Sequence, residues 1–193
     1  MSIKHFYEQL GITTFTEGHC GDCPCQQMIL KALCAGGAVK NVMEIGFNAG
    51  HSADLFLSSN EIIEMVSFDI GHHDYVNTGK EYIDKTYPDR HTLILGDSLN
   101  TVPQHNKKYD LIFIDGCHKF NNVRNDILNC RKLAHPETIV IIDDTITNDD
   151  WIKNYNIGPN LAWKGAVEWN IVKHHASVDF RPGRGMSWGK YCL

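Results

Sequence analysis

The chain has 193 residues, of which 42% are hydrophobic and 21% are charged, and its formal net charge is −5. This length predicts one globular domain over residues 1–193, and the acidic balance disfavours nucleic-acid backbones and anionic membranes as partners. No stretch reaches the roughly 20 apolar residues of a membrane span, and the start lacks the apolar core of a signal peptide. We therefore expect a cytoplasmic protein whose seven cysteines are reduced thiols.

The first half of the chain alternates short apolar runs with amphipathic segments. Residues 41–46, 65–69 and 91–95 have the length and composition of buried strands. Helical patterns accompany them at residues 22–34, 49–57 and 77–87. Alternation of this kind favours parallel strands joined by right-handed crossovers, that is, a doubly wound α/β sheet.

The second half continues this pattern and then departs from it. Residues 109–115 and 138–143 are predicted strands, separated by a predicted helix at 121–133. The polar and aromatic stretch after Asp144 is typical of a loop over a site, and residues 164–174 could form one more helix. Residues 177–180 and 186–191 flank a glycine-containing turn, which predicts two antiparallel strands.

Three aspartates lie at the carboxyl ends of two predicted strands. Asp115 ends one apolar run, and Asp143 and Asp144 end the other. Open α/β sheets hold their chemistry at this edge, where clustered carboxylates repel unless a proton or a cation intervenes. We therefore expect a hard divalent cation, Mg²⁺ or Mn²⁺. His118, three residues past Asp115, is the candidate base.

Other interpretations of these acids remain open. Strand-end aspartates often cap helices or bind loop amides, so one of the three could be structural. Neighbouring strand residues point to opposite faces, so Asp143 and Asp144 reach one ion only if the strand has already ended. A metal-free site in which Asp115 or His118 acts alone is the alternative.

A glycine-containing loop follows the first predicted strand. Glu44-Ile-Gly46-Phe-Asn48-Ala-Gly50 allows the backbone to approach a ligand closely, but its spacing is not that of an NAD fingerprint. Asp69, at the tip of the second strand, is suited to accept hydrogen bonds from two ribose hydroxyls. The pattern indicates a nucleotide-type cofactor other than NAD.

Together with Gly96-Asp97-Ser98 and the strand that ends at Asp115, this loop resembles class I S-adenosylmethionine-dependent methyltransferases. The resemblance implies their Rossmann-like, mostly parallel seven-stranded sheet with an antiparallel C-terminal strand. It also implies that S-adenosylmethionine is bound by a set of residues at the loop and strand ends: Glu44, Gly46, Asn48, Gly50, Ser52, Asp69, Asp97, Ser98 and Asp115.

Within that family, Ile114-Asp-Gly-Cys-His118 and Ile142-Asp-Asp-Thr145 resemble the macrolide-sugar and, more distantly, the catechol type of O-methyltransferase. The resemblance implies magnesium ligands at Asp115, Asp143 and Asp144, with Asp115 and His118 as catalytic residues. The expected reaction is methyl transfer to an oxygen of a small-molecule acceptor. A metal-independent N- or C-methyltransferase and a non-catalytic S-adenosylmethionine-binding protein are the alternatives.

Three further groups of residues have weaker signals. The segment His19-Cys20-Gly-Asp-Cys23-Pro-Cys25 packs four soft ligands together, but its spacing favours a helix start beside the cofactor over a zinc site. Arg181, Arg184 and Lys190 could contact an anionic substrate, but they surround a hairpin turn and are expected to be solvated. Aromatic residues after the fifth strand could support a substrate lid: Trp151, Tyr155, Trp163 and Trp169. A short chain with an exposed lid is compatible with a homodimer.

Overall fold

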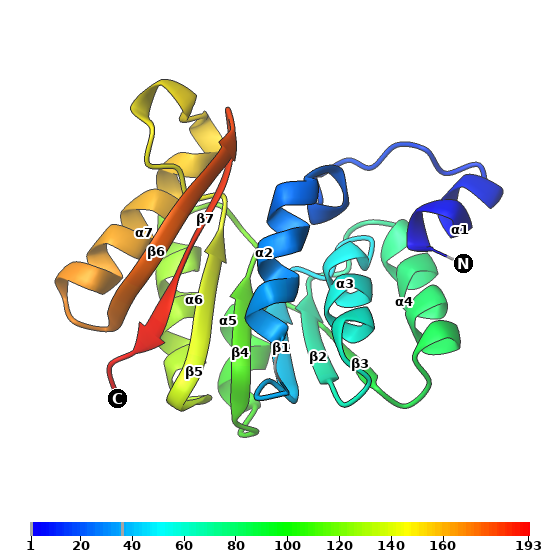
Figure 1. The fold of residues 1–193 in the computed structure, drawn as a ribbon, viewed down its shortest axis with the longest axis horizontal. Coiled ribbons are helices and arrows are strands. Elements are labelled where there is room, and N and C mark those ends of the chain that lie inside the picture. Colours follow the sequence, from blue (N-terminus) through cyan, green and yellow to red (C-terminus); the bar gives the residue numbers. More distant parts are fainter. Residues whose placement is uncertain (1, 36) are drawn as a thin grey trace.

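The structure, a computed structural model, describes residues 2–35 and 37–193 and is built on seven strands. The strands are β1 (Asn41–Ile45), β2 (Glu64–Asp69), β3 (His91–Leu95), β4 (Tyr109–Ile114), β5 (Ala134–Asp143), β6 (Val172–Arg181) and β7 (Arg184–Tyr191). They form one sheet in the order β3-β2-β1-β4-β5-β7-β6, shown in Figure 1. Strands β1 to β5 pair in parallel, and β7 is antiparallel to both β5 and β6. The predicted sheet is confirmed.

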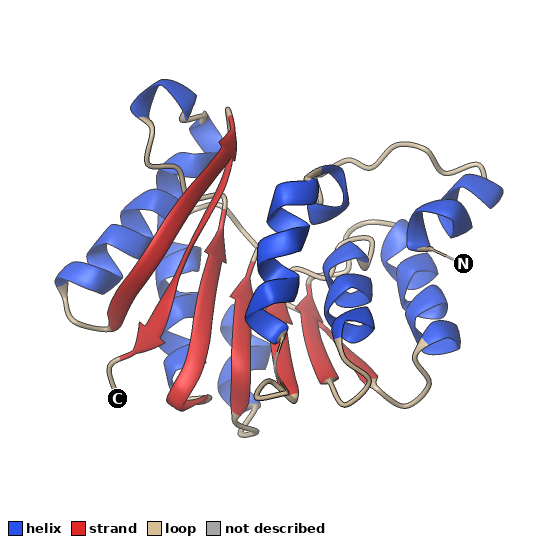
Figure 2. Cartoon of the chain, viewed as in Figure 1, coloured by secondary structure: helices blue, strands red, loops and turns tan. Residues whose placement is uncertain are grey.

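Helices cover both faces of the sheet, as Figure 2 shows. One layer contains α1 (Ile3–Gln9), α2 (Pro24–Cys34), α3 (His51–Ser59) and α4 (Tyr75–Thr86). The opposite layer contains α5 (Ser98–Thr101), α6 (Phe120–Arg131) and α7 (Ile157–Glu168). Short 3-10 turns complete the connections: η1 (Cys20–Asp22), η2 (Val102–Gln104), η3 (Asp149–Trp151) and η4 (Asn154–Asn156).

Alternate residues of each central strand contribute to two separate hydrophobic cores. In β4, Leu111 and Phe113 pack under α2, α3 and α4, whereas Ile112 and Ile114 pack against α6 and α7. Strands that are buried on both faces are expected to be continuously apolar, and this explains why the sequence shows runs and not alternation. The two cores leave the carboxyl ends of β1, β4 and β5 at one edge of the sheet.

The helix expected over residues 164–174 is wrong in its position along the chain. Helix α7 begins at Ile157 and ends at Glu168, and the chain is already in β6 from Val172. Gly158 and Pro159 lie in the first turn of α7, where a missing N–H group breaks no helical hydrogen bond. The tripeptide Ile157-Gly158-Pro159, which is typical of a loop, therefore begins a helix here.

Helix α1, helix α5 and the 3-10 turns have no counterpart among the predicted elements. Within the described residues, the helices are all too short or too polar to cross a bilayer.

Candidate active site

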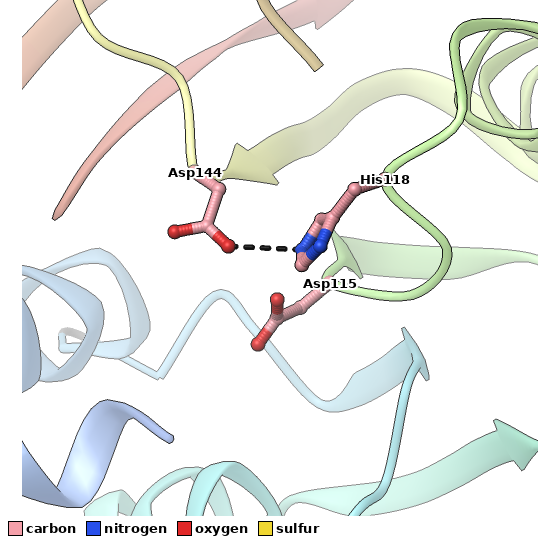
Figure 3. A group of neighbouring side chains, drawn as sticks. All are labelled: Asp115, His118 and Asp144. Carbon is pink, nitrogen blue, oxygen red and sulfur yellow. Dashed lines mark ion pairs between the residues drawn. The ribbon is translucent and has the colours of Figure 1, made fainter. Parts of the chain in front are cut away.

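Three side chains converge at the carboxyl ends of β4 and β5, as Figure 3 shows. Asp115 follows β4 directly, His118 lies in the loop before α6, and Asp144 follows β5 directly. One ligand atom from each lies within 4.8 Å of the others. The Nε2 atom of His118 is 2.9 Å from Oδ2 of Asp144. In residues 2–35 and 37–193, no other cluster of three His, Cys, Asp or Glu side chains has this geometry.

The backbone separates the two adjacent aspartates. Asp143 is the last residue of β5, while Asp144 has a φ of 56°, in the left-handed region. The strand has therefore ended before Asp144, and its carboxylate turns toward His118. The backbone would thus allow Asp143 and Asp144 to approach one ion, because the strand no longer turns their side chains to opposite faces. The two side chains nevertheless have different partners.

Asp143 is held on the α2 side of the cluster. Both of its carboxylate oxygens accept a hydrogen bond from Nε2 of Gln26 in α2, at 2.8 Å. The guanidinium of Arg184 lies beside it, with Nη1 3.5 Å from Oδ2. The structure thus brings Asp144, and not Asp143, together with Asp115 and His118.

The acids of the site disfavour one another's ionised forms. Burial, and then the neighbouring carboxylates of Asp143 and Asp144, raise the pKa of Asp115 well above its ordinary value. Burial and the charge of Asp144 raise the pKa of Asp143 to about 7. The hydrogen bond to Asp144 raises the pKa of His118. A cluster of this kind favours any additional cation.

The donor set fits a hard divalent cation. Oδ1 of Asp144 is buried and accepts no hydrogen bond from residues 2–35 and 37–193, and Nη1 of Arg184 lies 4.0 Å from it. Such an orphaned carboxylate oxygen costs free energy unless a ligand satisfies it. The carboxylate oxygens of Asp115 and Asp144 are suitable ligands for Mg²⁺ or Mn²⁺, and the imidazole of His118 lies beside them.

The glycine loop after β1 is anchored by a buried acid. Glu44 is fully buried, and its two oxygens accept hydrogen bonds from Ser52 at 2.7 Å and Ser67 at 2.6 Å. Gly46 has a φ of +98°, and a Cβ there would overlap the carbonyl oxygen of Asp115. The loop therefore needs glycine at position 46 because β1 and β4 converge there.

Asp69 also holds this loop. Its carboxylate accepts hydrogen bonds from the backbone N–H of Asn48 at 2.8 Å and of Gly71 at 2.7 Å. Each oxygen keeps a further lone pair, so the acid retains capacity for ligand hydroxyls.

A hollow of about 220 Å³, open solvent included, lies against the glycine loop. Gly46, Asn48 and Asp115 line it. Gly18, His19 and Cys20 also line it, and they belong to residues 18–21, which we call the roof segment. The His19 ring stacks on the His51 ring at a centroid distance of 3.7 Å. His19 and Cys20, from the segment that the sequence places at the start of a helix, therefore lie beside the glycine loop.

Asp97 and Ser98 lie after β3 and do not line this hollow. The Asp97 carboxylate accepts a hydrogen bond from the Leu99 N–H at 2.9 Å and so caps α5. Ser98 donates to Asp126 of α6 at 2.8 Å. Burial raises the pKa of Asp126 to about 7.

Arg184 was not identified from the sequence as part of the site. Its expected solvation is wrong, because Arg184 is only 9% exposed and contacts Asp143, Asp144 and the backbone of His19. The hairpin pattern correctly predicts the turn, but the turn is folded over the strand ends and not out into solvent. No local signal identifies Gln26 either, since its partner is 117 residues away.

The remaining candidate residues fall into different environments. Among the described residues, the histidine and cysteines of the segment 19–25 do not form a metal-binding group, and Cys25 is exposed. Tyr155 is close to His118, with ring centroids 5.7 Å apart. Trp163 is buried in the core, and Trp169 lies exposed beside Arg124 of α6.

Comparisons with known proteins agree with this fold. Several solved structures resemble the whole chain. A Staphylococcus aureus protein described as a candidate caffeoyl-CoA O-methyltransferase has a TM-score of 0.78 and 16% identity, covering 99% of this chain and 92% of that chain. The O-methyltransferase from Bacillus cereus in complex with SAH has a TM-score of 0.76 and 17% identity, covering 97% and 88%. TomG, a Streptomyces achromogenes O-methyltransferase solved with SAM, has a TM-score of 0.74 and 13% identity, covering 98% of this chain and 87% of that chain. At these identities the likeness establishes the fold.

The sheet is therefore that of the Rossmann-like methyltransferases. A family model described as a methyltransferase domain matches residues 43–145, which is just over half of the chain. The chain belongs to this family and is an S-adenosylmethionine-dependent methyltransferase, as the sequence resemblance predicts. A comparison with curated proteins finds no match.

Proposed function

We propose that the protein transfers the methyl group of S-adenosylmethionine to an oxygen of a small-molecule acceptor, assisted by Mg²⁺ or Mn²⁺. The observation that carries the proposal is the position of Asp115, which lines the hollow and also belongs to the cluster with His118 and Asp144. A donor in the hollow and an acceptor at the cluster would share one wall. Methyl transfer requires such an arrangement, because positioning supplies much of the acceleration. Solved structures with this fold include O-methyltransferases bound to SAH or SAM.

The glycine loop would hold the methionine part of the donor. Gly46 allows the backbone to approach it, and Asn48 and Ser52 line the same hollow. Gly50, also predicted to bind the donor, does not line the hollow, and a Cβ there would meet the Phe47 ring at 2.9 Å, so its role would be to let the loop turn. Glu44 has both oxygens occupied by serines, so in this proposal it shapes the loop from behind.

The rest of the donor would lie along the tips of β2 and β3. Asp69 would accept hydrogen bonds from the ribose hydroxyls with the lone pairs that Asn48 and Gly71 leave free. Asp97 and Ser98 would flank the adenine with their backbone, since their side chains bind Leu99 and Asp126.

Asp115 and Asp144 would hold the cation, which when bound would lower the proton affinity of the acceptor oxygen. Asp144 could bind the cation and orient His118 at once, because Oδ2 faces His118 and Oδ1 has no hydrogen bond to the described residues. Asp143, the third predicted ligand, would add negative charge from behind while Gln26 and Arg184 hold it.

His118 would take up the acceptor proton. Its Nε2 faces the Asp144 carboxylate and would carry a hydrogen there, which leaves Nδ1 as the basic atom. Half-exposed on its loop, the imidazole could pass the proton on to water.

Replacing Asp144 by Asn tests the division between donor and cation. We expect wild type to bind both S-adenosylmethionine and Mn²⁺ in calorimetric titrations. The Asp144→Asn variant should bind S-adenosylmethionine within about threefold of wild type, and its Mn²⁺ affinity should fall by at least about tenfold, because one charged ligand is lost. Asp149→Asn, at an exposed acid of η3, is the control and should change neither. Equal Mn²⁺ affinity in wild type and Asp144→Asn would contradict the proposed site.

A metal-free mechanism is the second candidate, and the His118–Asp144 pair favours it because an acid already orients the imidazole. Chelation by EDTA separates the two. Turnover on an alcohol or phenol acceptor should be lost with EDTA and restored by Mg²⁺ if the cation is required. Undiminished turnover in EDTA would support the metal-free mechanism.

A further inference from the structure

Arg184 is the buried cation that connects two parts of the site lying far apart in the sequence. It is the first residue of β7, and its side chain is only 11% exposed. Nη1 lies 3.5 Å from Asp143 Oδ2 and 4.0 Å from Asp144 Oδ1. Nη2 donates a 2.7 Å hydrogen bond to the carbonyl oxygen of His19 in the roof segment. One guanidinium therefore contacts both the acids and the roof.

The roof segment has other attachments to the rest of the chain, since Cys20 is buried in the core and the Phe15 ring meets the His19 ring edge-on at a centroid distance of 5.1 Å. The Nδ2 of Asn48 donates to the Gly18 carbonyl at 3.2 Å, and Nε2 of Gln27 donates to the carbonyls of Cys20 and Gly21. The stacked rings of His19 and His51 add a contact without charge, since burial lowers the pKa of His51 to about 3. Among the hydrogen bonds that described residues of other elements make to residues 18–21, that from Arg184 is the charge-assisted one.

The planar fork of arginine is what makes both contacts possible at once. A guanidinium presents donors in several fixed directions, so it can pair with a carboxylate and still donate elsewhere. A lysine ammonium at the same place would keep the charge but would have to choose between the acids and the roof. The acids are the stronger attraction, because they are buried and negatively charged.

We propose that Arg184 is a positioning residue that ties the roof of the donor hollow to the strand-end acids and thereby sets the affinity for the donor. The proposal rests on the proposed function, because it takes the hollow as the donor site. It assigns no direct contact with donor or acceptor to Arg184. Its role is to keep residues 18–20 closed over the hollow, with Asp143 and Asp144 as the anchor.

Two substitutions test the tether in the ligand-free protein. Arg184→Lys keeps the charge and removes the fork. Gly18→Ala leaves Arg184 unchanged but places a methyl group 3.0 Å from its Nη2, and Gly18 is exposed, so folding should tolerate the change. Arg181→Lys, at the exposed end of β6, is the matched control. Hydrogen exchange of the amides at residues 18–23 should be about tenfold faster in the first two variants and unchanged in the third.

Donor affinity is measured separately by calorimetry with S-adenosylhomocysteine. We expect Arg184→Lys to bind it about tenfold more weakly than wild type and to bind Mn²⁺ within about threefold, because the charge near the acids is retained. Unchanged exchange at residues 18–23 in both Arg184→Lys and Gly18→Ala would overturn the tether, as would wild-type S-adenosylhomocysteine affinity in Arg184→Lys. A wild-type protein that binds no S-adenosylhomocysteine would instead contradict the proposed function, and the exchange comparison would still decide whether the tether exists.

Discussion

At the scale of single residues, Glu44 shows how the glycine loop depends on a buried carboxyl group. Its carboxylate is fully buried with Ser52 and Ser67 as partners, and Ser67 also contacts Nε2 of His91 at 2.7 Å. Burial raises the pKa of Glu44 to about 7, more than the serine hydrogen bonds lower it. The ionised form is thus less favoured in the folded protein than in the unfolded chain.

This shift predicts that the folded state loses stability as pH rises. Between about 4.5 and about 7 the unfolded chain has released the Glu44 proton while the folded protein still holds it, so the free energy of unfolding falls. The Glu44→Gln variant lacks this proton. We expect its stability relative to wild type to increase by about 3 kcal/mol from pH 4.5 to pH 7.5, measured by urea unfolding of both proteins. If the stabilities of wild type and Glu44→Gln changed in parallel with pH, the raised pKa of the buried Glu44 carboxyl would be contradicted.

The site residues illustrate which roles a sequence can predict. Asp115, Asp144 and His118 were identified because each follows an apolar strand, and strand ends share one edge of the sheet. The different partners of Asp143 could not be predicted, because they depend on a left-handed φ at Asp144 and on Gln26 and Arg184, which approach from distant parts of the chain.

At the scale of elements, the start of α7 determines where the His118 loop lies. Gly158, in the first turn of α7, packs so closely that a Cβ there would overlap the carbonyl oxygen of His118. The pair Gly158-Pro159 predicts a loop in the sequence, since glycine and proline usually interrupt helices, and this prediction is wrong. The tertiary contact explains the glycine at this position: it lets the helix approach the loop that carries the candidate base.

Replacing Gly158 by Ala should therefore displace the His118 loop. We expect a loss of about 2–4 kcal/mol in stability, measured by thermal or urea unfolding, because backbone must move on one side of the contact. Gly165→Ala, in the same helix, is the control. Its Cβ would meet Trp169 at an ordinary 3.7 Å, so helix propensity should make it stabilising by up to about 1 kcal/mol. Equal effects of the two substitutions would argue against the close contact.

At the scale of the whole molecule, the sheet could be predicted because its physics is local. Apolar runs of strand length alternate with amphipathic helices, and the five parallel strands and the final antiparallel hairpin follow from these periods. The N-terminal region was harder to predict. Helix α1 has seven residues, and the roof segment is held by contacts such as that between His19 and Arg184, 165 residues apart. No short-range pattern contains such a contact.

The central claim is that the donor methyl group and a cation on Asp115 and Asp144 lie side by side. It can be tested by NMR with S-adenosylmethionine that carries a ¹³C-labelled methyl group, using Mn²⁺ as a paramagnetic probe and Mg²⁺ as the diamagnetic control. We predict that the methyl signal of the bound donor broadens strongly with Mn²⁺ in wild type, stays sharp with Mg²⁺, and stays sharp with Mn²⁺ in Asp144→Asn. A methyl signal that remains sharp in wild type with both donor and Mn²⁺ bound would contradict the proposed site.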